Sequence, residues 1–220
     1  MTVGAKICGL SDLAGVDAAI AGGAAMVGFV FYPPSPRHLE PAGAAPLAAR
    51  ASGAAERVGL FVDPDDAQLE ATLKTVDLDW IQLHGAETPT RAAAIRTRFD
   101  KPVMKALRVR SAADVAAAGD YAGLVDRLLF DAPPPDRADA LPGGNGEAFD
   151  WRLLKGADVA TPWMLAGGLT PDTVAAAIAE SGATMVDVSS GVESAPGVKD
   201  TGMIQAFLTA TRAAGPRDAA

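Results

Sequence analysis

The chain has 220 residues, of which 49% are hydrophobic and 21% are charged, so it has enough apolar material for one large folded domain. Its formal net charge of -8 argues against general nucleic-acid binding, because that needs a basic surface to displace counterions from phosphates. Cys8 is the only cysteine, and His38 and His84 are the only histidines, which excludes an internal disulfide and argues against a zinc site.

Eight short apolar runs follow one another along the chain, each ending in a turn or a helix-capping signal. They are Val3–Cys8, Met26–Phe31, Arg57–Val62, Trp80–Leu83, Pro102–Leu107, Arg127–Phe130, Trp163–Ala166 and Thr184–Val188. Most precede an alanine-rich stretch with helical spacing, a pattern typical of buried parallel strands joined by crossover helices. Eight such strands can close without a free edge, so the sequence predicts an α/β fold, a single-domain (β/α)8 TIM barrel over residues 1–214. Residues 215–220 are expected to form a disordered tail.

The helices between these runs have ordinary start signals. Start signals are expected at Asp65-Asp66, Thr88-Pro89 and Thr170-Pro171-Asp172, and a further helix is expected to begin near Asp200. Pro89 and Pro171 are expected in the first turns of helices that include Ala92–Phe99 and Val174–Ala179. The proline-rich stretch Ala132–Pro142 is predicted to be a long loop after the sixth strand.

Barrels of this kind form their active sites at the C-terminal ends of the strands, and the first strand ends at Cys8. Residues two apart on a strand face the same side, so Lys6 and Cys8 should both point into the barrel. A free thiol has a pKa of about 8.5, which a nearby positive charge lowers toward neutrality. Cys8 is therefore a candidate general base. Two alternatives stay open: Cys8 as a small buried apolar residue, and Lys6 paired with Asp187.

Two more side chains suit catalysis or binding. Asp131 closes the sixth apolar run, where a carboxyl group suits a general acid, although a capping or loop-anchoring role is about as common. Arg37 stands on a proline-stiffened loop after the second strand, where a guanidinium can pair bidentately with a substrate carboxylate. The alternative for Arg37 is a solvated surface arginine.

Glycine-containing turns follow the seventh and eighth strands. The candidate phosphate-binding residues there are Gly167, Gly168, Ser189, Ser190 and Gly191. Loops at these two places are the usual phosphate site of barrel enzymes, because exposed backbone N–H groups and a helix N-terminus favour an anion. A phosphate site is therefore predicted, with plain tight turns as the simpler alternative.

Three residues are possible further substrate contacts. Gln82 and His84 end the fourth strand, although a histidine hydrogen-bonded for structural reasons is more common. Gly144 lies in the glycine-rich stretch 143–146, which has the flexibility to fold over a ligand.

Together these stretches resemble the phosphoribosylanthranilate isomerase family. The resemblance rests on KICGL (6–10), GFVFYPPSPRHL (28–39), VGLFV (58–62), IQLHG (81–85), LLFDA (128–132), GGNGEAFDW (143–151), LAGGLTP (165–171) and VDVSSGVESAPGVKD (186–200). These occur in the family's order and span almost the whole chain. The resemblance implies an isomerase of tryptophan biosynthesis.

The reaction implied by this resemblance is the Amadori rearrangement of N-(5-phosphoribosyl)anthranilate to 1-(2-carboxyphenylamino)-1-deoxy-D-ribulose 5-phosphate. Asp131 would be the general acid that helps to open the ribose ring, and Cys8 the general base that removes the C2 proton. Arg37 would hold the anthranilate carboxylate, and the loops after strands seven and eight the phosphate. The substrate nitrogen would be the electron sink, so no cofactor and no metal are expected.

Two positions depart from the family's pattern. Asp12 stands where the family commonly has arginine, which casts doubt on an anion-binding role there, and Asn145 stands where the glycine-rich loop usually has threonine. Histidine-pathway and dual-substrate isomerases are alternatives, but they use an aspartate at the end of strand one, where this chain has Cys8. Indole-glycerol-phosphate synthase is similar only in its phosphate loops. A non-catalytic phosphate-binding barrel would not need Cys8 and Asp131.

The expected partner is a small phosphorylated substrate, with no nucleic acid and no membrane, and the chain is expected to be a monomer or a homodimer. No apolar stretch approaches the roughly 20 residues that cross a bilayer. The start, Met1 to Lys6, lacks the basic-then-apolar pattern of a signal peptide, so a cytoplasmic location is expected.

Overall fold

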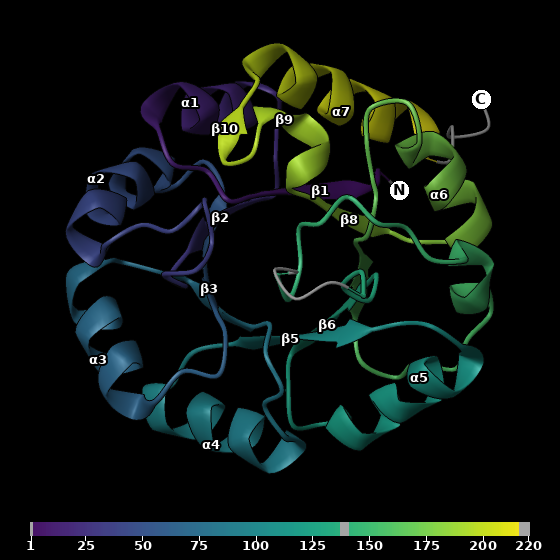
Figure 1. The fold of residues 1–220 in the computed structure, drawn as a ribbon, viewed down its shortest axis with the longest axis horizontal. Coiled ribbons are helices and arrows are strands. Elements are labelled where there is room, and N and C mark those ends of the chain that lie inside the picture. The colour runs from purple at the N-terminus through teal and green to yellow at the C-terminus, as the bar shows by residue number, and fades with distance from the viewer. Residues whose placement is uncertain (1, 137–140, 216–220) are drawn as a thin grey trace.

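The computed structural model describes residues 2–136 and 141–215, so all but the first residue of the tail expected at 215–220 lies outside the described residues. Eight parallel strands form a closed barrel in chain order, each paired with its sequence neighbours and β8 paired with β1 (Figure 1). The strands are β1 (Gly4–Cys8), β2 (Met26–Val30), β3 (Glu56–Phe61), β4 (Trp80–Leu83), β5 (Val103–Arg108), β6 (Arg127–Asp131), β7 (Trp163–Leu165) and β8 (Met185–Val188). Each strand starts and ends within one residue of its predicted bounds, and the predicted TIM barrel is confirmed.

Helices surround the barrel on the outside, as Figure 1 shows. They are α1 (Leu13–Ala21), α2 (Pro41–Ala51), α3 (Asp66–Thr75), α4 (Pro89–Phe99), α5 (Ala112–Ala116), which continues as a 3-10 turn η1 (Ala117–Tyr121), α6 (Val174–Ser181) and α7 (Thr201–Ala214). At three of the predicted helix starts, the side chains of Asp65, Thr88 and Asp200 each accept a hydrogen bond from a backbone N–H in the first turn. None of the described helices is both long and apolar enough to cross a bilayer.

The predicted start of α6 is wrong by about one turn. The helix begins at Val174 with Thr173 as its N-cap, so Pro171 precedes the helix instead of standing in its first turn. The physical reason is local: the Thr170 hydroxyl accepts a hydrogen bond from the Thr173 N–H, and the Thr170 N–H donates to the Thr173 hydroxyl. These bonds satisfy the polar groups of a separate turn ahead of the helix.

Two connections at the barrel mouth depart from simple strand–helix alternation. After β6, the described parts of the predicted loop Ala132–Pro142 have no regular structure, and a 3-10 turn, η2 (Trp151–Leu154), stands where other repeats have an α-helix. After β8, a 3-10 turn, η3 (Ser190–Val192), leads into a hairpin of β9 (Glu193–Ala195) and β10 (Val198–Lys199). This hairpin was not predicted from the sequence.

Alternation along β1 shows how the strands divide their side chains. Ala5 and Ile7 belong to the apolar core between strands and helices, whereas Lys6 and Cys8 point into the barrel, as predicted. A separate apolar cluster fills the lower barrel and includes Met26, Val58, Met104, Leu129 and Met164. Each fully buried large side chain of this kind contributes roughly 1.5–3 kcal/mol. The barrel floor is thus closed, and polar groups lie toward its C-terminal mouth.

Candidate active site

The C-terminal ends of the strands surround one pocket of about 790 Å³, measured out to the open solvent. The residues proposed from the sequence that line it are Cys8, Arg37, His84, Asp131, Gly144, Gly167, Gly168, Ser189, Ser190 and Gly191. Gln82 is fully buried behind the pocket wall and reaches the pocket only through His84. The fold therefore gathers in one cavity groups that are spread over the whole sequence.

Cys8 is buried at the end of β1, with 3% of its surface exposed. A side chain on Gly28 of neighbouring β2 would place its Cβ 2.9 Å from the Cys8 Sγ, so glycine at this position leaves the thiol its space. Burial raises the pKa of the thiol above its ordinary value; Lys6 acts in the opposite direction, and Asp187 adds to the increase. The prediction that the pKa of Cys8 is lowered toward neutrality is therefore wrong for the site without substrate.

The contacts of Lys6 explain in part why the pKa of Cys8 is not lowered. Its Nζ donates a hydrogen bond of 2.9 Å to Asp187 Oδ1, and the lysine is fully buried. Burial alone would lower the pKa of Lys6, but Asp187 and Cys8 raise it above its ordinary value. Lys6 is therefore charged, but Asp187 neutralises much of its field at Cys8. The structure settles the alternative that the sequence left open: Lys6 pairs with Asp187.

Asp131, at the end of β6, is held by two hydrogen-bonding contacts. Its Oδ1 accepts from the Ala132 N–H at 2.8 Å, and its Oδ2 lies 3.2 Å from His84 Nε2. His84 Nδ1 in turn lies 3.0 Å from Gln82 Nε2. Gln82, His84 and Asp131 thus form a chain from β4 to β6, and within the described residues the Gln82 Oε1 has no hydrogen-bond partner.

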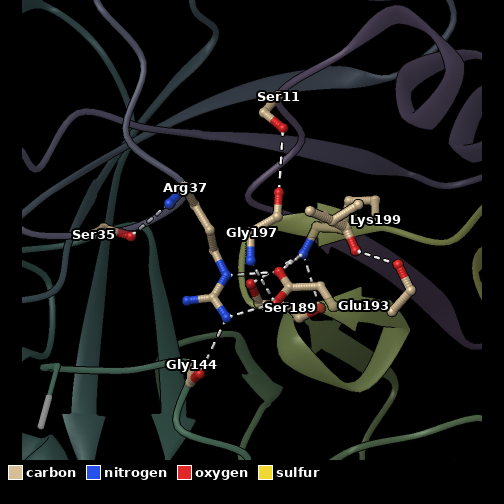
Figure 2. A network of polar contacts seen from close by, with 10 residues as sticks. Ser11, Ser35, Arg37, Gly144, Ser189, Glu193, Gly197 and Lys199 are labelled. Atoms are coloured by element: carbon tan, nitrogen blue, oxygen red, sulfur yellow. Dashed lines mark hydrogen bonds and ion pairs between the residues drawn. The ribbon is translucent and has the colours of Figure 1, made fainter.

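Arg37 lies on the loop after β2, where its backbone N–H donates to Ser35 Oγ. Figure 2 shows its guanidinium facing Glu193 of β9. Arg37 Nε donates to Glu193 Oε1 at 2.7 Å, and Nη2 donates to Glu193 Oε2 at 2.8 Å and to the Gly144 carbonyl at 3.2 Å. Arg37 is 5% exposed, so it is not a solvated surface arginine.

Sequence reasoning missed Glu193 and Lys199 as members of this site. Lys199 Nζ donates to Glu193 Oε1 at 2.6 Å and to the Ser189 carbonyl at 2.8 Å. Burial alone would raise the pKa of Glu193, but the hydrogen bonds from Arg37 and the charge of Lys199 hold it below its ordinary value. The only local signal for the hairpin that carries both residues is the turn dipeptide Pro196-Gly197.

The loops after β7 and β8 lie against each other beside Asp131. Gly167 and Gly168 both have positive φ, at 84° and 65°, a conformation that favours glycine. A Cβ on Gly191 would run into the Leu169 carbonyl, so the two loops are in backbone contact. This arrangement brings the candidate phosphate-binding residues to one side of the pocket.

The structure also assigns local roles to the two departures from the family's pattern. Asp12 caps α1, with its Oδ1 accepting from the Gly15 N–H at 2.7 Å. Asn145 ties the glycine-rich loop to Leu141 by two hydrogen bonds. Its Nδ2 donates to the Leu141 carbonyl at 2.8 Å, and its Oδ1 accepts from the Leu141 N–H at 3.3 Å. Among the described residues, no group of three or more His, Cys, Asp or Glu side chains is placed to hold a metal ion.

Comparisons with known proteins agree with this geometry. The family model described as N-(5'phosphoribosyl)anthranilate (PRA) isomerase matches residues 5–210. An N-(5'-phosphoribosyl)anthranilate isomerase from Paramagnetospirillum magneticum is 56% identical over 216 residues, which cover 98% of this chain and 100% of that protein. The crystal structure of phosphoribosyl anthranilate isomerase from Thermotoga maritima is 33% identical, with a TM-score of 0.86 over 96% of this chain and 100% of that chain.

A further solved structure holds a ligand. It is a phosphoribosyl anthranilate isomerase in complex with reduced 1-(o-carboxyphenylamino)-1-deoxyribulose 5-phosphate. It is 32% identical to this chain, with a TM-score of 0.83, and the match covers 96% of this chain and 100% of the other.

Proposed function

The chain belongs to the N-(5'-phosphoribosyl)anthranilate isomerase family, and on that premise we propose that Cys8 and Asp131 carry out the proton transfers by which it isomerises N-(5'-phosphoribosyl)anthranilate in tryptophan biosynthesis. The observation that carries this proposal is that Cys8 from β1 and Asp131 from β6 line one pocket, together with Arg37 and the glycine loops after β7 and β8. A substrate with a carboxylate at one end and a phosphate at the other matches this distribution of groups.

Asp131 is the general acid of the first step. It donates a proton to the ribose ring oxygen, the bond from that oxygen to C1 breaks, and the nitrogen lone pair forms the C1 iminium. The contact with His84 supports this role by position: His84 Nε2 lies 3.2 Å from Asp131 Oδ2 and holds the carboxyl group at the wall of the pocket.

Cys8 is the general base of the second step. Its thiolate removes the proton from C2, the electron pair neutralises the iminium, and the resulting enolamine tautomerises to the ketone. Since burial favours the neutral thiol in the free site, the cationic iminium is the group that favours the thiolate at the moment when it is needed. This order explains how a buried cysteine can act as a base.

The remaining contacts bind the two anionic ends of the substrate. Arg37 pairs with the anthranilate carboxylate, because its guanidinium is buried and presents a fixed fork to the pocket. Gly167, Gly168, Ser189, Ser190 and Gly191 bind the phosphate. His84 beside Asp131 and Gly144 beside Arg37 are further substrate contacts. The substrate nitrogen supplies the electron sink, so the proposed steps route no electrons through a cofactor.

The test follows the loss of substrate fluorescence with EDTA present, in the wild type and in Cys8→Ala and Asp131→Asn. We expect fast conversion by the wild type and a loss of about 10²–10⁴-fold in each variant, as for removal of a general acid or base. Asp136→Asn, a change of an exposed aspartate on the same loop, is the matched control and should keep full activity. A wild type that binds the substrate but does not convert it would contradict the proposal.

A further inference from the structure

Glu193 does not line the pocket, yet it accepts a hydrogen bond at each of four positions. Its Oε1 accepts from Arg37 Nε at 2.7 Å and from Lys199 Nζ at 2.6 Å. Its Oε2 accepts from Arg37 Nη2 at 2.8 Å and from the Gly197 N–H at 3.1 Å. These four bonds use the four lone pairs of a carboxylate, so its position is fixed from every side (Figure 2).

The contact with Glu193 occupies only one edge of the Arg37 guanidinium. Glu193 uses Nε and one N–H of Nη2, and the second N–H of Nη2 donates to the Gly144 carbonyl. Among the described residues, the two N–H groups of Nη1 make no hydrogen bond, and a ligand that displaces the Gly144 carbonyl gains Nη2 as well. The edge that faces the pocket is therefore a two-donor fork of the kind that binds a carboxylate bidentately.

The net charge of Arg37, Glu193 and Lys199 together still attracts an anion. Glu193 carries one negative charge between two positive groups, Arg37 and Lys199, and the three side chains are almost fully buried, with 6%, 4% and 0% of Arg37, Glu193 and Lys199 exposed. The group as a whole keeps a single positive charge. A carboxylate at Glu193 therefore does not cancel the attraction of Arg37 for an anionic ligand.

The hairpin that carries Glu193 is itself docked on the loop that carries Arg37. Gly197, between β9 and β10, has a φ of 81°, and a Cβ there would lie 2.6 Å from the carbonyl of Pro36, the residue before Arg37. Lys199 joins the same unit to the predicted phosphate loop, because its Nζ donates to the carbonyl and the hydroxyl of Ser189.

We propose that Glu193 is a positioning residue for the isomerisation: it holds the Arg37 guanidinium edge-on so that the free edge binds the substrate carboxylate. Lys199 supports this arrangement because it balances the charge of Glu193. It also fixes the distance between Arg37 and Ser189, and hence the distance between the carboxylate and phosphate subsites. This inference rests on the proposed function of Arg37 and names how that binding group is oriented.

The experiment compares steady-state kinetics of the wild type, Glu193→Gln, Arg37→Lys and the double variant. Glutamine keeps the shape of Glu193 but accepts through one oxygen only, so Arg37 loses its second anchor. We expect kcat/KM to fall about 10- to 100-fold in Glu193→Gln, as for a displaced binding group, and mainly through a higher KM. Because both changes act through one contact, the double variant should be hardly worse than Arg37→Lys alone.

A second substrate separates positioning from a merely structural role. N-(5-phosphoribosyl)aniline, made from aniline and ribose 5-phosphate, lacks the carboxylate. If wild type converts it, Glu193→Gln should convert it at nearly the wild-type rate, whereas a structural role would impair both substrates. Glu180→Gln, the same substitution at an exposed site on α6, is the matched control and should leave KM unchanged. If Glu193→Gln does not fold, Glu193→Gln/Lys199→Met removes both buried charges and is measured instead.

Two results overturn the inference and stay distinct from failure of the proposed function. An unchanged or lower KM in Glu193→Gln, with Arg37→Lys impaired, shows that Glu193 does not position Arg37. Fully additive losses in the double variant show the same. By contrast, an unchanged KM in Arg37→Lys rejects the carboxylate-binding role of Arg37 itself, and the inference fails with it.

Discussion

Lys6 and Asp187 occupy paired register positions on β1 and β8, and their side chains form an ion pair of 2.9 Å inside the barrel. Lys6 is fully buried and Asp187 is 7% exposed. The pair lies next to Cys8 at the base of the pocket, where Lys6 lowers the pKa of the thiol and Asp187 raises it. Two predictions follow from it, one for stability and one for the titration of Cys8.

Lys6→Met should destabilise the protein by about 3–5 kcal/mol, because it leaves the Asp187 carboxylate buried without its partner. Chemical denaturation with fluorescence detection measures the free energy of unfolding. Lys6→Met/Asp187→Asn, which has no unpaired charge, should be more stable than Lys6→Met alone. Equal midpoints for wild type and Lys6→Met would contradict the importance of this pair.

The reactivity of the Cys8 thiol should rise with pH across the physiological range. Burial raises the pKa of the Cys8 thiol, so the thiolate that acts as base is scarce at pH 7 and becomes more abundant as the pH increases. We expect the reactivity of the thiol to keep increasing above pH 8.5, because the ordinary thiol pKa is about 8.5. Cys8 is the sole cysteine, so iodoacetamide labelling against pH reports its titration directly. In Lys6→Met the labelling curve should move to still higher pH; an unchanged curve means that Lys6 does not influence the thiol.

Gly28→Ala should reduce turnover without unfolding the barrel. The new Cβ would lie 2.9 Å from Cys8 Sγ and 3.2 Å from Lys6 Cε, so the thiol must move away from its position. We expect kcat to fall about 10- to 100-fold, as for a small displacement of a reacting group. Gly43→Ala is the matched control, because a Cβ there meets nothing within 4 Å. Full activity in Gly28→Ala would show that the position of the thiol is not critical.

His84→Ala should lower kcat more than it changes KM. His84 Nε2 lies 3.2 Å from Asp131 Oδ2, and removing the ring frees the carboxyl group from the orientation in which it donates its proton. The expected loss is about 10- to 100-fold. Gln82→Leu, which leaves the ring in place but removes its partner at Nδ1, should give a smaller loss of the same kind. His38→Ala tests the other histidine, which contacts Glu40 outside the pocket, and should have no effect on kcat.

Asp79→Asn should lower stability at neutral pH but not in acid. The hydrogen bonds from Arg57 hold the pKa of Asp79 below its ordinary value, against the opposing effect of burial. The folded state therefore binds the proton less readily than the unfolded chain, so the contribution is present above the ordinary aspartate pKa of about 3.9 and disappears as the pH falls through the folded value.

Denaturation at a series of pH values measures this effect. Since Asp79 is partly exposed, with 36% of its side chain accessible, we expect a difference of about 1 kcal/mol at pH 7 that vanishes in strong acid. Asp77→Asn, a change of a more exposed partner of the same arginine, should have a smaller effect. A difference between wild type and Asp79→Asn that grows in acid would contradict the sign of this argument.

Much of the fold could be predicted because its signals are local. Apolar runs of strand length and capping residues such as Asp65, Thr88 and Asp200 lie next to the elements that they define. The first error, at α6, arose where two threonines bond to each other instead of capping the helix. The second omission, the hairpin β9–β10, has strands of only three and two residues, too short for a periodic pattern.

The barrel and the strand ends that carry Cys8 and Asp131 could be predicted from the sequence alone, and the resemblance implied the chemistry expected there. The groups that hold the site in place became visible only in the folded chain. Arg37 and Glu193 are 156 residues apart, and Lys6 and Asp187 are 181 apart, so their pairing depends on closure of the barrel. The direction of the Cys8 pKa shift likewise depends on burial and on the balance of two opposite charges. Such quantities are set by distances through space, which no local pattern of residues encodes.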